Sequence, residues 1–416
     1  MVLLLTSLIL LSSVGINGLL WGLTGCVRGL LERRTATTSM EPAPSTSDVA
    51  VLIAAHNEAA VIERTLSVAA RQVPISRIHV VSDGSSDETA FLAGHLGAQI
   101  LNLPKSRGKG GALVAGIEHF KLCERFQILV ILDADTELSE DYIETGLRLF
   151  AQPEVAAVAG MIHTVRRTKD LSALGRMLMA YRERVYLLAQ YVVKFGQAWA
   201  DVVFVASGCA SLYRTEALRH LQLNVPGLVV EDVNMTFTMH RKHLGRVAFH
   251  PRAAVAYTQD PTNLSDYRHQ VGRWALGYWQ SVLRSRWRAR KFDFTIGLFS
   301  AELLASCAIV FLTVLATFAF LGTILVNGMG AHLHFISDHF AIRMAIGVFG
   351  ADLVISAVVA VLQRQWVILL WAVAFPFIRV LDAWLALRAF VAAFTTQSTG
   401  RWTSPRRRTA DVVKVS

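Results

Sequence analysis

Two pairs of acidic residues stand where the chain could carry out group-transfer chemistry. Asp133 and Asp135 are two residues apart after an apolar run over residues 127–132, so in an extended chain their carboxylates face the same side. Two such carboxylates suit a hard divalent cation that also binds a diphosphate. Glu231 and Asp232 follow another apolar run, and a carboxylate there could act as a general base. Either pair could instead cap the following helix, which for Glu231 and Asp232 taken alone is the simpler interpretation.

Polar side chains that could bind a nucleotide occur in two other parts of the chain. Asp83 ends an apolar run and is placed to accept hydrogen bonds from a base or a ribose, whereas Asp87 is expected to cap the next helix. Lys109 lies in a glycine-rich loop over residues 105–111, whose backbone can approach a ligand closely. Its ammonium suits a phosphate. The alternative is an ordinary solvated lysine.

A third group of side chains is spaced for one face of a helix. Gln270, Arg273 and Trp274 stand at positions i, i+3 and i+4. Such a face can stack on a sugar and hydrogen-bond to it. A helix lying on a membrane surface also favours Trp and Arg, and Trp279 fits that alternative without any substrate.

The elements that must position these residues alternate between strands and helices. Short apolar runs predict strands over residues 49–54, 79–82, 99–101 and 127–132, with helical stretches between them. This order predicts an α/β domain with a mostly parallel sheet and helices on both faces. Polar clusters follow three of the strands, as in a nucleotide site at the carboxyl edge of a sheet. Neither GxGxxG nor GxxxxGK[ST] is present, which argues against a dehydrogenase and a P-loop protein.

Long apolar runs flank this central region. Residues 2–27 carry no charge and are long enough to cross about 30 Å of hydrocarbon, and the basic residues that follow favour an outside N-terminus. Further candidates cover residues 296–326, 344–362 and 366–394. Four full crossings would place the basic C-terminal tail outside, against the positive-inside rule. The fourth run, which contains Pro376, therefore remains open as a crossing, interfacial or re-entrant segment.

The charge distribution narrows the class of partner. The chain has a formal net charge of +10, and nearly all of that excess lies within residues 284–291 and 401–416. A nucleic-acid-binding face would spread Lys and Arg over a folded surface, so we expect no nucleic acid. Arg284, Arg286 and Arg288 are instead expected to meet lipid headgroups. The four cysteines form no CxxC pair, which argues against a zinc or redox site.

Taken in order, the motifs resemble those of the membrane-embedded, family 2 processive glycosyltransferases, namely cellulose, hyaluronan, chitin and poly-N-acetylglucosamine synthases. The resemblance covers residues 49–279 and the flanking membrane helices. It rests on Asn57-Glu58, Asp83 to Asp87, Gly108 to Ala112, Asp133-Ala134-Asp135, Ser207-Gly208, Glu231-Asp232 and Gln270 to Trp274. Within the family the chain is most similar to bacterial poly-N-acetylglucosamine synthases. The Phe-Phe-Cys-Gly motif of cellulose synthases is replaced by Ala206-Ser207-Gly208-Cys209.

This resemblance implies an α/β GT-A glycosyltransferase domain joined to an α-helical transmembrane bundle, and an inverting reaction. The nucleotide-sugar site would comprise Asn57, Glu58, Asp83, Lys109, Asp133 and Asp135, with Asp133 and Asp135 at the diphosphate and at Mg²⁺ or Mn²⁺, and Asp135 the more direct ligand. Asp232 would be the base beside Glu231. The acceptor and leaving-group side would comprise Ser207, Gly208, Gln270, Arg273 and Trp274.

The expected organisation follows from the same resemblance. It comprises an N-terminal membrane helix (1–31), a linker (32–47), a cytosolic GT-A domain (48–283), a basic interfacial segment (284–295), membrane or interfacial helices (296–395) and a basic tail (396–416). We expect a multi-pass protein of the plasma or inner membrane.

The expected partners are a UDP-sugar, with UDP-GlcNAc as the first choice, a growing glycan or lipid acceptor, the bilayer, and a small membrane accessory subunit. A single-addition transferase acting on a polyprenyl phosphate or a glycolipid is the alternative. A second alternative is a binding or assembly protein with a degenerate transferase domain.

Overall fold

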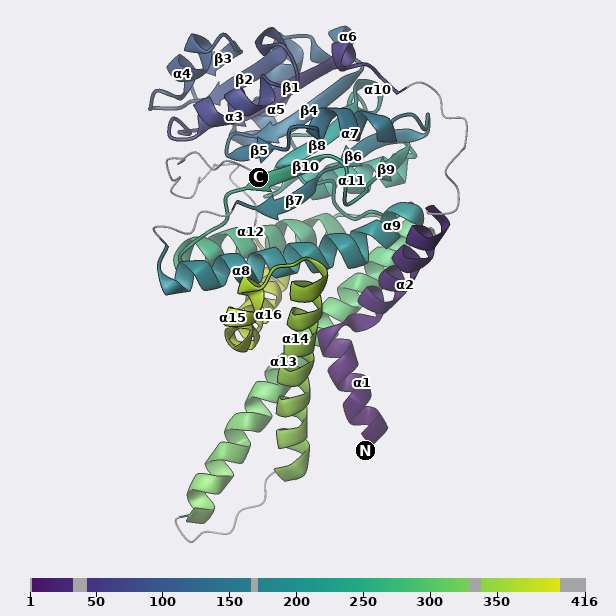
Figure 1. Cartoon of the computed structure of the whole chain (residues 1–416), viewed down its shortest axis with the longest axis vertical. Helices are drawn as coiled ribbons and strands as arrows, with labels where there is room; N and C mark the ends of the chain where they lie inside the picture. Colours follow the sequence, from purple (N-terminus) through teal and green to yellow (C-terminus); the bar gives the residue numbers. More distant parts are fainter. Residues whose placement is uncertain (1, 33–42, 166–170, 329–337, 397–416) are drawn as a thin grey trace.

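The computed structural model describes residues 2–32, 43–165, 171–328 and 338–396 (Figure 1). Most of the expected linker and all but the first residue of the expected basic tail lie outside these ranges. The described chain forms three layers in Figure 1: an α/β domain, a layer of long helices beneath it, and helices that extend away from the domain.

A seven-stranded sheet forms the centre of the α/β domain. Its strand order is β3-β2-β1-β4-β8-β6-β9, and neighbouring strands are parallel except where β8 pairs with β4 and β6. The expected mostly parallel sheet is thereby confirmed. The strands are β1 (Val49–Ala55), β2 (Ile78–Asp83), β3 (Gln99–Leu103), β4 (Ile128–Asp133), β6 (Val155–Ala159), β8 (Ala210–Arg214) and β9 (Arg246–Ala248).

Both faces of this sheet are covered, which explains why its central strands are apolar throughout. Alternate residues of β1 pack on opposite sides: Leu52 belongs to the core under α5 (Gly108–His119), and Ile53 to the core under α3 (Ile62–Ala69) and α7 (Tyr142–Leu149). Gly116 lets α5 lie directly on the sheet, because a Cβ there would stand 2.6 Å from the Val81 side chain.

Smaller elements complete the domain. A second sheet of order β5-β10-β7 joins β5 (Thr136–Leu138), β10 (Val255–Thr258) and β7 (Met161–Thr164). The remaining helices of the domain are α4 (Thr89–His95), α6 (Leu122–Arg125), α10 (Thr215–Leu218) and α11 (Glu231–Lys242), with 3₁₀ turns at Thr46–Asp48 and Ile75–Arg77.

A layer of long helices separates the sheets from the apolar helices (Figure 1). One of them is α8 (Ala173–Leu187), which continues through a π-helical turn (Leu188–Lys194) into α9 (Phe195–Trp199). The other is α12 (Leu264–Leu283), which carries the predicted helical face of Gln270. Both helices lie directly beneath the α/β domain, so residues on them can face the domain above or the helices below.

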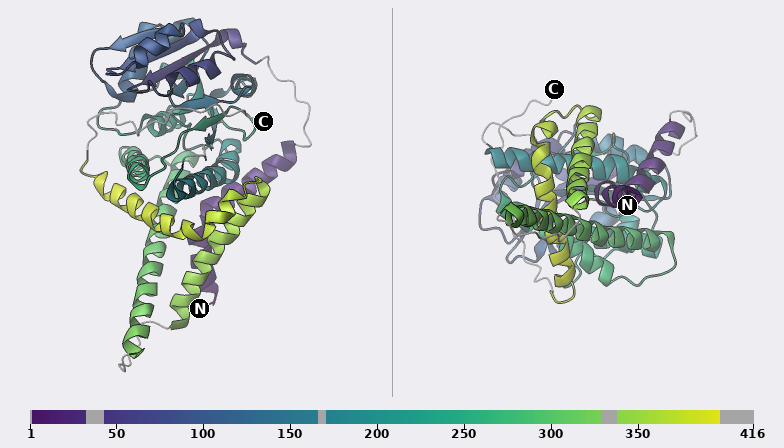
Figure 2. Two further views of the ribbon diagram at one scale, coloured as in Figure 1. Left: turned by 60° about the vertical axis from the view of Figure 1, so that its left-hand side comes forward. Right: turned by 90° about the horizontal axis from the view of Figure 1, so that it is seen from below.

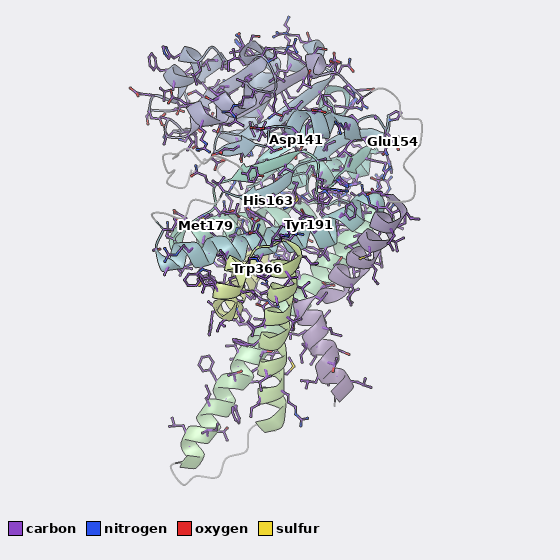
Figure 3. The ribbon with its side chains drawn as sticks, viewed as in Figure 1. Asp141, Glu154, His163, Met179, Tyr191 and Trp366 are labelled. Carbon is purple, nitrogen blue, oxygen red and sulfur yellow. The ribbon has the colours of Figure 1, made fainter. Side chains whose placement is uncertain are left out.

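The apolar helices follow this layer. α13 (Lys291–Gly328) and α14 (Asp338–Leu362) extend away from the domain side by side (Figures 1 and 2), followed by α15 (Val367–Trp371), a 3₁₀ turn (Ala372–Ala374) and α16 (Phe375–Ala392). By length and composition, residues 291–326, 342–362 and 367–392 could each cross a membrane. Trp366, which is 60% exposed, lies between α14 and α15 at the level of α8 (Figure 3).

The N-terminal apolar run is divided in two. α1 (Val2–Ser13) and α2 (Gly15–Glu32) are bent by 70° at Gly15, which has φ +74°, instead of forming one straight helix. Glu302 of α13 accepts hydrogen bonds from the backbone and the side chain of Asn17, at 2.8 and 3.0 Å. Its carboxylate thus satisfies an amide that the start of a helix leaves free.

The segment that follows α14 has both of its ends on the domain side. α15 packs against α8, and beyond α16 the Thr396 carbonyl accepts a hydrogen bond of 3.0 Å from Gln280 of α12. Figure 2 shows α16 crossing beneath the α/β domain rather than running alongside α13 and α14. The geometry therefore favours the interfacial or re-entrant alternative for this run.

Two acidic residues of the apolar helices point inward and accept hydrogen bonds from the layer above. Asp352 of α14 is buried and accepts hydrogen bonds from Arg184 of α8, at 2.7 Å, and from Arg379 of α16, at 3.0 Å. Asp382 of α16 accepts hydrogen bonds from two tyrosine hydroxyls of the interfacial layer, Tyr181 and Tyr267, both at 2.7 Å. Pairing of this kind is what charged groups in an apolar bundle require.

Candidate functional site

The side chain of Lys109 lies at the centre of a cluster of acidic residues. Its Nζ is 2.7 Å from Asp133 Oδ1, 2.9 Å from Glu231 Oε1 and 2.9 Å from the carbonyl oxygen of Gly208. These three partners match the three donors of an ammonium group, and the side chain is only 18% exposed. Lys109 is therefore not the solvated lysine of the alternative interpretation. It joins Asp133 to Glu231.

Sheet topology brings these residues together from distant parts of the chain. Because β8 runs antiparallel to β4, the loop that precedes β8 lies beside the residues that follow β4. The amide of Asp133 donates to the carbonyl of Cys209 at 2.8 Å, which fixes Gly208 next to Asp133. Lys109 enters from the first turn of α5, and Glu231 is the first residue of α11.

Asp232 is held by two backbone amides. Its Oδ2 accepts from Gly208 at 2.8 Å and its Oδ1 accepts from Val233 at 2.7 Å. A Cβ on residue 208 would stand 3.0 Å from Asp232 Oδ2 and 3.1 Å from Lys109 Nζ, so a glycine keeps the loop this close. The two predicted residues Gly208 and Asp232 are thus in direct contact.

The protonation of the two neighbouring acids is driven in opposite directions. Burial, followed by the negative charge of Glu231, raises the pKa of Asp232 above its ordinary value. Burial also disfavours the charged form of Glu231, but the Lys109 ammonium outweighs it and lowers the pKa of Glu231. Neighbouring acids with pKa values pushed apart are typical of sites where one acid moves a proton and the other stays charged.

Asp133 and Asp135 offer two carboxylates for a cation. Burial raises the pKa of Asp133, although Lys109 opposes this, and Asp135 is buried with the Thr136 hydroxyl 3.4 Å from its Oδ1. Within the described ranges, no group of three His, Cys, Asp or Glu side chains could hold a metal ion. The pair fits a cation that takes its other ligands from a diphosphate and water, as Mg²⁺ commonly does.

The residues expected at the nucleoside organise two loops. Asp83 is fully buried and accepts hydrogen bonds from the Ser106 hydroxyl and from the amides of Arg107 and Gly108, at 2.7, 2.7 and 2.9 Å. Since Lys109 follows Gly108 directly, Asp83 shapes the turn that delivers Lys109 to the cluster.

Asn57 and Glu58 form hydrogen bonds that hold the neighbouring loop. Asn57 adopts φ +55° and accepts a hydrogen bond of 2.8 Å from the Ser86 amide. Glu58 is buried, and its amide donates to Thr89 Oγ1 at 2.8 Å. Asp87 accepts a hydrogen bond of 3.0 Å from the Thr89 amide at the start of α4, but the N-cap residue of this helix is Glu88, one position later than the cap expected from the sequence.

The three predicted α12 residues differ in their relation to the acid cluster. Arg273 is exposed, and its charge helps to lower the pKa of Glu231. Trp274 stacks under the guanidinium of Arg182, which is 4.5 Å from the centre of its ring. Gln270 Oε1 is buried without a hydrogen-bond partner in the described part of the chain. The helix also packs on α16, and Trp274 lies against the apolar cluster that contains Ala389 of α16.

Two basic residues of the site were missed in the sequence. Lys194 closes the π-helical turn after α8, with its Nζ 3.5 Å from Ser207 Oγ. Burial lowers the pKa of Lys194 to about 8, against the pull of nearby anions that include Asp232. A lone lysine within the uncharged stretch 188–199 was a signal that could have identified it.

Arg182, the second missed residue, is buried in α8. It is 3.1 Å from Asp260 Oδ1 and 2.6 Å from the Tyr186 hydroxyl, in addition to its contact with Trp274. The sequence offered only the run Arg182-Glu183-Arg184, which reads as a solvated helical face. All three side chains are buried.

Comparison with known proteins gives a consistent assignment. Residues 44–277 match the family described as glycosyltransferase like family 2. The chain is 26% identical over 276 residues to a poly-beta-1,6-N-acetyl-D-glucosamine synthase of Staphylococcus epidermidis, a match that covers 64% of this chain and 63% of that synthase. It is 24% identical over 323 residues to a hyaluronan synthase of Streptococcus pyogenes, covering 71% of this chain and 75% of that synthase.

The fold has a counterpart among solved structures. A mannosyltransferase of Pyrobaculum calidifontis, solved in complex with GDP-Man and Mn²⁺, matches 94% of this chain and 99% of its own length, with a TM-score of 0.55 and 16% identity. At that identity the likeness concerns the fold alone. The expected GT-A-like domain with attached apolar helices is confirmed.

Proposed function

The chain belongs to glycosyltransferase family 2 and is related to polysaccharide synthases; on that basis we propose that it extends a β-linked polysaccharide from a UDP-sugar with inversion at the anomeric carbon. UDP-GlcNAc is the proposed donor, supported by the similarity to poly-beta-1,6-N-acetyl-D-glucosamine synthase. The observation that carries the proposal is the cluster in which Lys109 joins Asp133, on the donor side, to Glu231, beside the base.

The reaction needs a base at the acceptor hydroxyl. Asp232 takes the proton as the hydroxyl oxygen bonds to the anomeric carbon, and the bond from that carbon to the nucleoside diphosphate breaks. A raised pKa makes Asp232 a stronger base than an ordinary aspartate, and its bonds to the Gly208 and Val233 amides fix its direction. Glu231 stays anionic beside Lys109 and keeps the ammonium in place.

The donor side must accommodate a diphosphate. Asp133 and Asp135 would hold Mg²⁺ or Mn²⁺, which when bound offsets the negative charge of the leaving diphosphate. Asp83 holds the turn that carries Lys109 to Asp133. The Mn²⁺ of the mannosyltransferase from Pyrobaculum calidifontis supports a divalent cation in this fold.

The helical layer is the proposed acceptor side. The charge of Arg273 acts on Glu231, Gln270 Oε1 is buried without a hydrogen-bond partner among the described residues, and the guanidinium of Arg182 lies over the Trp274 ring. An indole on this layer could stack on a sugar ring. The same layer rests on apolar helices, which supports a membrane protein. We propose that it lies in the plasma or inner membrane, with the α/β domain in the cytosol and the product leaving through the bundle.

A donor screen tests the proposal. Purified full-length protein in lipid nanodiscs is incubated with UDP-GlcNAc, UDP-Glc, UDP-GlcA or GDP-mannose, without any added subunit, and nucleoside diphosphate release is measured. The expected result is fastest turnover of UDP-GlcNAc, reduced at least about a thousandfold in Asp232→Asn. Faster turnover of another donor would mean that this donor, and not UDP-GlcNAc, is the preferred substrate. Full activity of Asp232→Asn contradicts the assigned base, and no turnover with any donor favours a binding protein.

A further inference from the structure

The backbone that leads into the proposed base is held by one face of α12. Residues 226–230 run directly into Glu231 and Asp232, the first two residues of α11. The N-cap residue of this helix is Val230, whose apolar side chain cannot accept a hydrogen bond from the first turn. Because the helix has no capping side chain, contacts with other elements must fix the backbone at its start.

Gln280 of α12 binds this backbone with its side-chain amide. Its Oε1 accepts a hydrogen bond of 3.2 Å from the Val229 amide, three residues before Asp232. Its Nε2 donates to the Thr396 carbonyl beyond α16, at 3.0 Å. Gln280 is only 2% exposed. Since one end of its amide can only accept and the other can only donate, these two partners fix the orientation of the side chain.

Two more residues on the same face of α12 contact the segment. Gly277 precedes Gln280 by three positions and Arg284 follows it by four. Gly277 lets the helix lie directly on Val230, because a Cβ there would stand 2.5 Å from Val230 Cγ2. Arg284 donates to the Pro226 carbonyl at 2.8 Å. The helix therefore contacts both ends of the segment.

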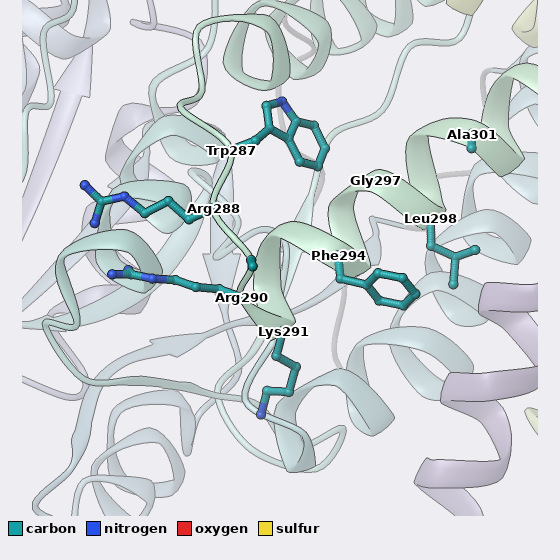
Figure 4. Close-up of a pocket in the computed structure, with 9 residues that line it drawn as sticks. Trp287, Arg288, Arg290, Lys291, Phe294, Gly297, Leu298 and Ala301 are labelled. Atoms are coloured by element: carbon teal, nitrogen blue, oxygen red, sulfur yellow. The ribbon is translucent and has the colours of Figure 1, made fainter.

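Arg284 differs in this contact from the arginines that follow it. Arg288 and Arg290 line a pocket of about 700 Å³ at the start of α13, where their charged ends point away from Phe294 (Figure 4). Among the basic residues 284–291, all within the described chain, only Arg284 forms a hydrogen bond with the segment before α11. Its bond to a backbone carbonyl is distinct from the headgroup contact expected from the sequence.

We propose that Gln280 is a positioning residue of the transferase site. By holding the Val229 amide it sets where Asp232 stands at the start of α11, and Arg284 assists at the other end of the segment. The Asp232 carboxylate is itself bound by the Gly208 amide at 2.8 Å, so α12 fixes the backbone and Gly208 fixes the side chain. This inference rests on the proposed function, in which Asp232 is the base.

Removing both hydrogen bonds of Gln280 tests the role. Gln280→Met keeps the length of the side chain, and nucleoside diphosphate release is measured in nanodiscs with the preferred donor. We expect kcat to fall about tenfold, because a small misplacement of a catalytic group slows the chemical step. The KM for the donor should change less than about twofold, since both lost hydrogen bonds lie outside the donor side of the site.

Tyr278→Phe is the matched control. It removes a hydrogen bond of 2.7 Å that ties α12 to Ser300 of α13, and it leaves the hydrogen bonds of the segment intact. Its kcat should stay within about twofold of the wild type. Equal losses of kcat in Tyr278→Phe and Gln280→Met would mean that any loosening of α12 slows the reaction, which overturns the specific role of Gln280.

The surface contact supplies a second pair of variants that should not disturb folding. Arg284→Gln should lower kcat about threefold, less than Gln280→Met, because an exposed hydrogen bond contributes less than a buried one. Arg286→Gln, at an exposed neighbouring position without a hydrogen bond to the segment, should leave kcat unchanged. Equal losses in the two arginine variants would mean that their charge at the membrane matters and not the contact with Pro226.

Hydrogen exchange followed by mass spectrometry examines the segment without turnover. In Gln280→Met the peptide covering residues 226–232 should exchange faster, since the Val229 amide has lost its acceptor, whereas Tyr278→Phe should exchange at the wild-type rate. Unchanged exchange in Gln280→Met, or faster exchange with unchanged kcat, overturns the positioning role alone. A wild-type protein that turns over no donor contradicts the proposed function itself, and the positioning role with it.

Discussion

At the scale of single residues, Lys109 is the central contact of the site, because its ammonium binds groups from three parts of the chain. Asp133 comes from β4, Gly208 from the loop before β8 and Glu231 from α11. Burial raises the pKa of Asp133 and weighs against every charge in the cluster, so the cation is needed to keep the acids together. Its own pKa lies well above the ordinary lysine value. Lys109 therefore stays charged in the site.

Removing this charge should damage both stability and activity. We expect Lys109→Met to lower the free energy of unfolding by about 3 kcal/mol, since it leaves two buried carboxylates without their cation. Nucleoside diphosphate release should fall at least about a hundredfold. Chemical denaturation of the detergent-solubilised protein and the release assay measure the two effects. Lys105→Met, at an exposed position of the same loop, is the control, and equal losses in both variants would contradict the role of the cluster.

The pH dependence of the reaction follows from two shifted groups. As pH falls, Asp232 becomes protonated and can no longer accept a proton, so kcat/KM should fall with an acidic limb above the ordinary aspartate value of 3.8. As pH rises through about 8, Lys194 loses its charge, and kcat/KM should fall again as the cation beside Ser207 disappears.

A variant of Lys194 tests whether this lysine is the group that causes the alkaline limb. Arginine stays charged at every accessible pH. In Lys194→Arg the alkaline limb should therefore move well above pH 8, while the acidic limb stays in place. An alkaline limb that is identical in the wild type and in Lys194→Arg would show that Lys194 is not the titrating group.

The sequence identified residues that end apolar strands better than residues inside helices. Asp133 could be predicted because it ends an apolar strand at the edge where a parallel sheet presents ligands. Asp232 follows an apolar run that forms no strand, and its expected role came from the family resemblance. The partners of Lys109 could not be predicted from the sequence, because a salt bridge between α5 and α11 depends on tertiary contacts between elements far apart in the chain. Lys194 and Arg182 lie in long helices. The periodicity of a helix predicts which residues share a face, but it does not predict which other elements pack against that face.

At the scale of elements, the bend between α1 and α2 involves a contact with a residue of another helix. Hydropathy is continuous through residues 2–27 and predicts one helix. The bend depends on Glu302, which is supplied by α13 and binds Asn17. No pattern local to the N-terminal run encodes that partner. The four predicted strands of the α/β domain, β1 to β4, in contrast follow their own apolar runs and were predicted within a few residues.

Gly15 should be the sensitive position of this bend. Gly15→Ala places a Cβ 1.9 Å from Glu302 Oε1 and forces a side chain into the left-handed region, so we expect the melting temperature to fall by several degrees. Gly322→Ala is the matched control, since nothing lies within 4 Å of a Cβ there. That helical substitution should leave the melting temperature unchanged or raise it. Equal effects of the two variants would contradict the importance of the bend.

At the scale of the whole molecule, the interfacial layer joins the domain to the apolar helices through buried polar contacts. Asp352 and Asp382 reach up to Arg184, Tyr181 and Tyr267. These contacts hold α14 and α16 against α8 and α12, so the proposed acceptor residues on α12 rest on the membrane part of the protein. The sequence could predict the apolar runs, but not which helix would turn back toward the domain.

The direction of α16 decides the topology. Since α15 packs on α8 and Thr396 bonds to Gln280, we expect residue 395 to lie on the same side of the membrane as the α/β domain. In a variant without native cysteines, Thr395→Cys and Glu88→Cys should react with an impermeant maleimide from the same side of sealed vesicles. Labelling from opposite sides would mean that the segment crosses the membrane.

The central claim is that this transferase builds a polymer, and product length tests it most directly. Purified protein in nanodiscs is given UDP-GlcNAc as the only donor, and the products are separated by size. The proposed function predicts a ladder of β-linked chains of increasing length, absent from Asp232→Asn. One discrete lipid-linked product, unchanged as the donor concentration and time are increased, would contradict polymerisation and assign the protein to single-addition transfer.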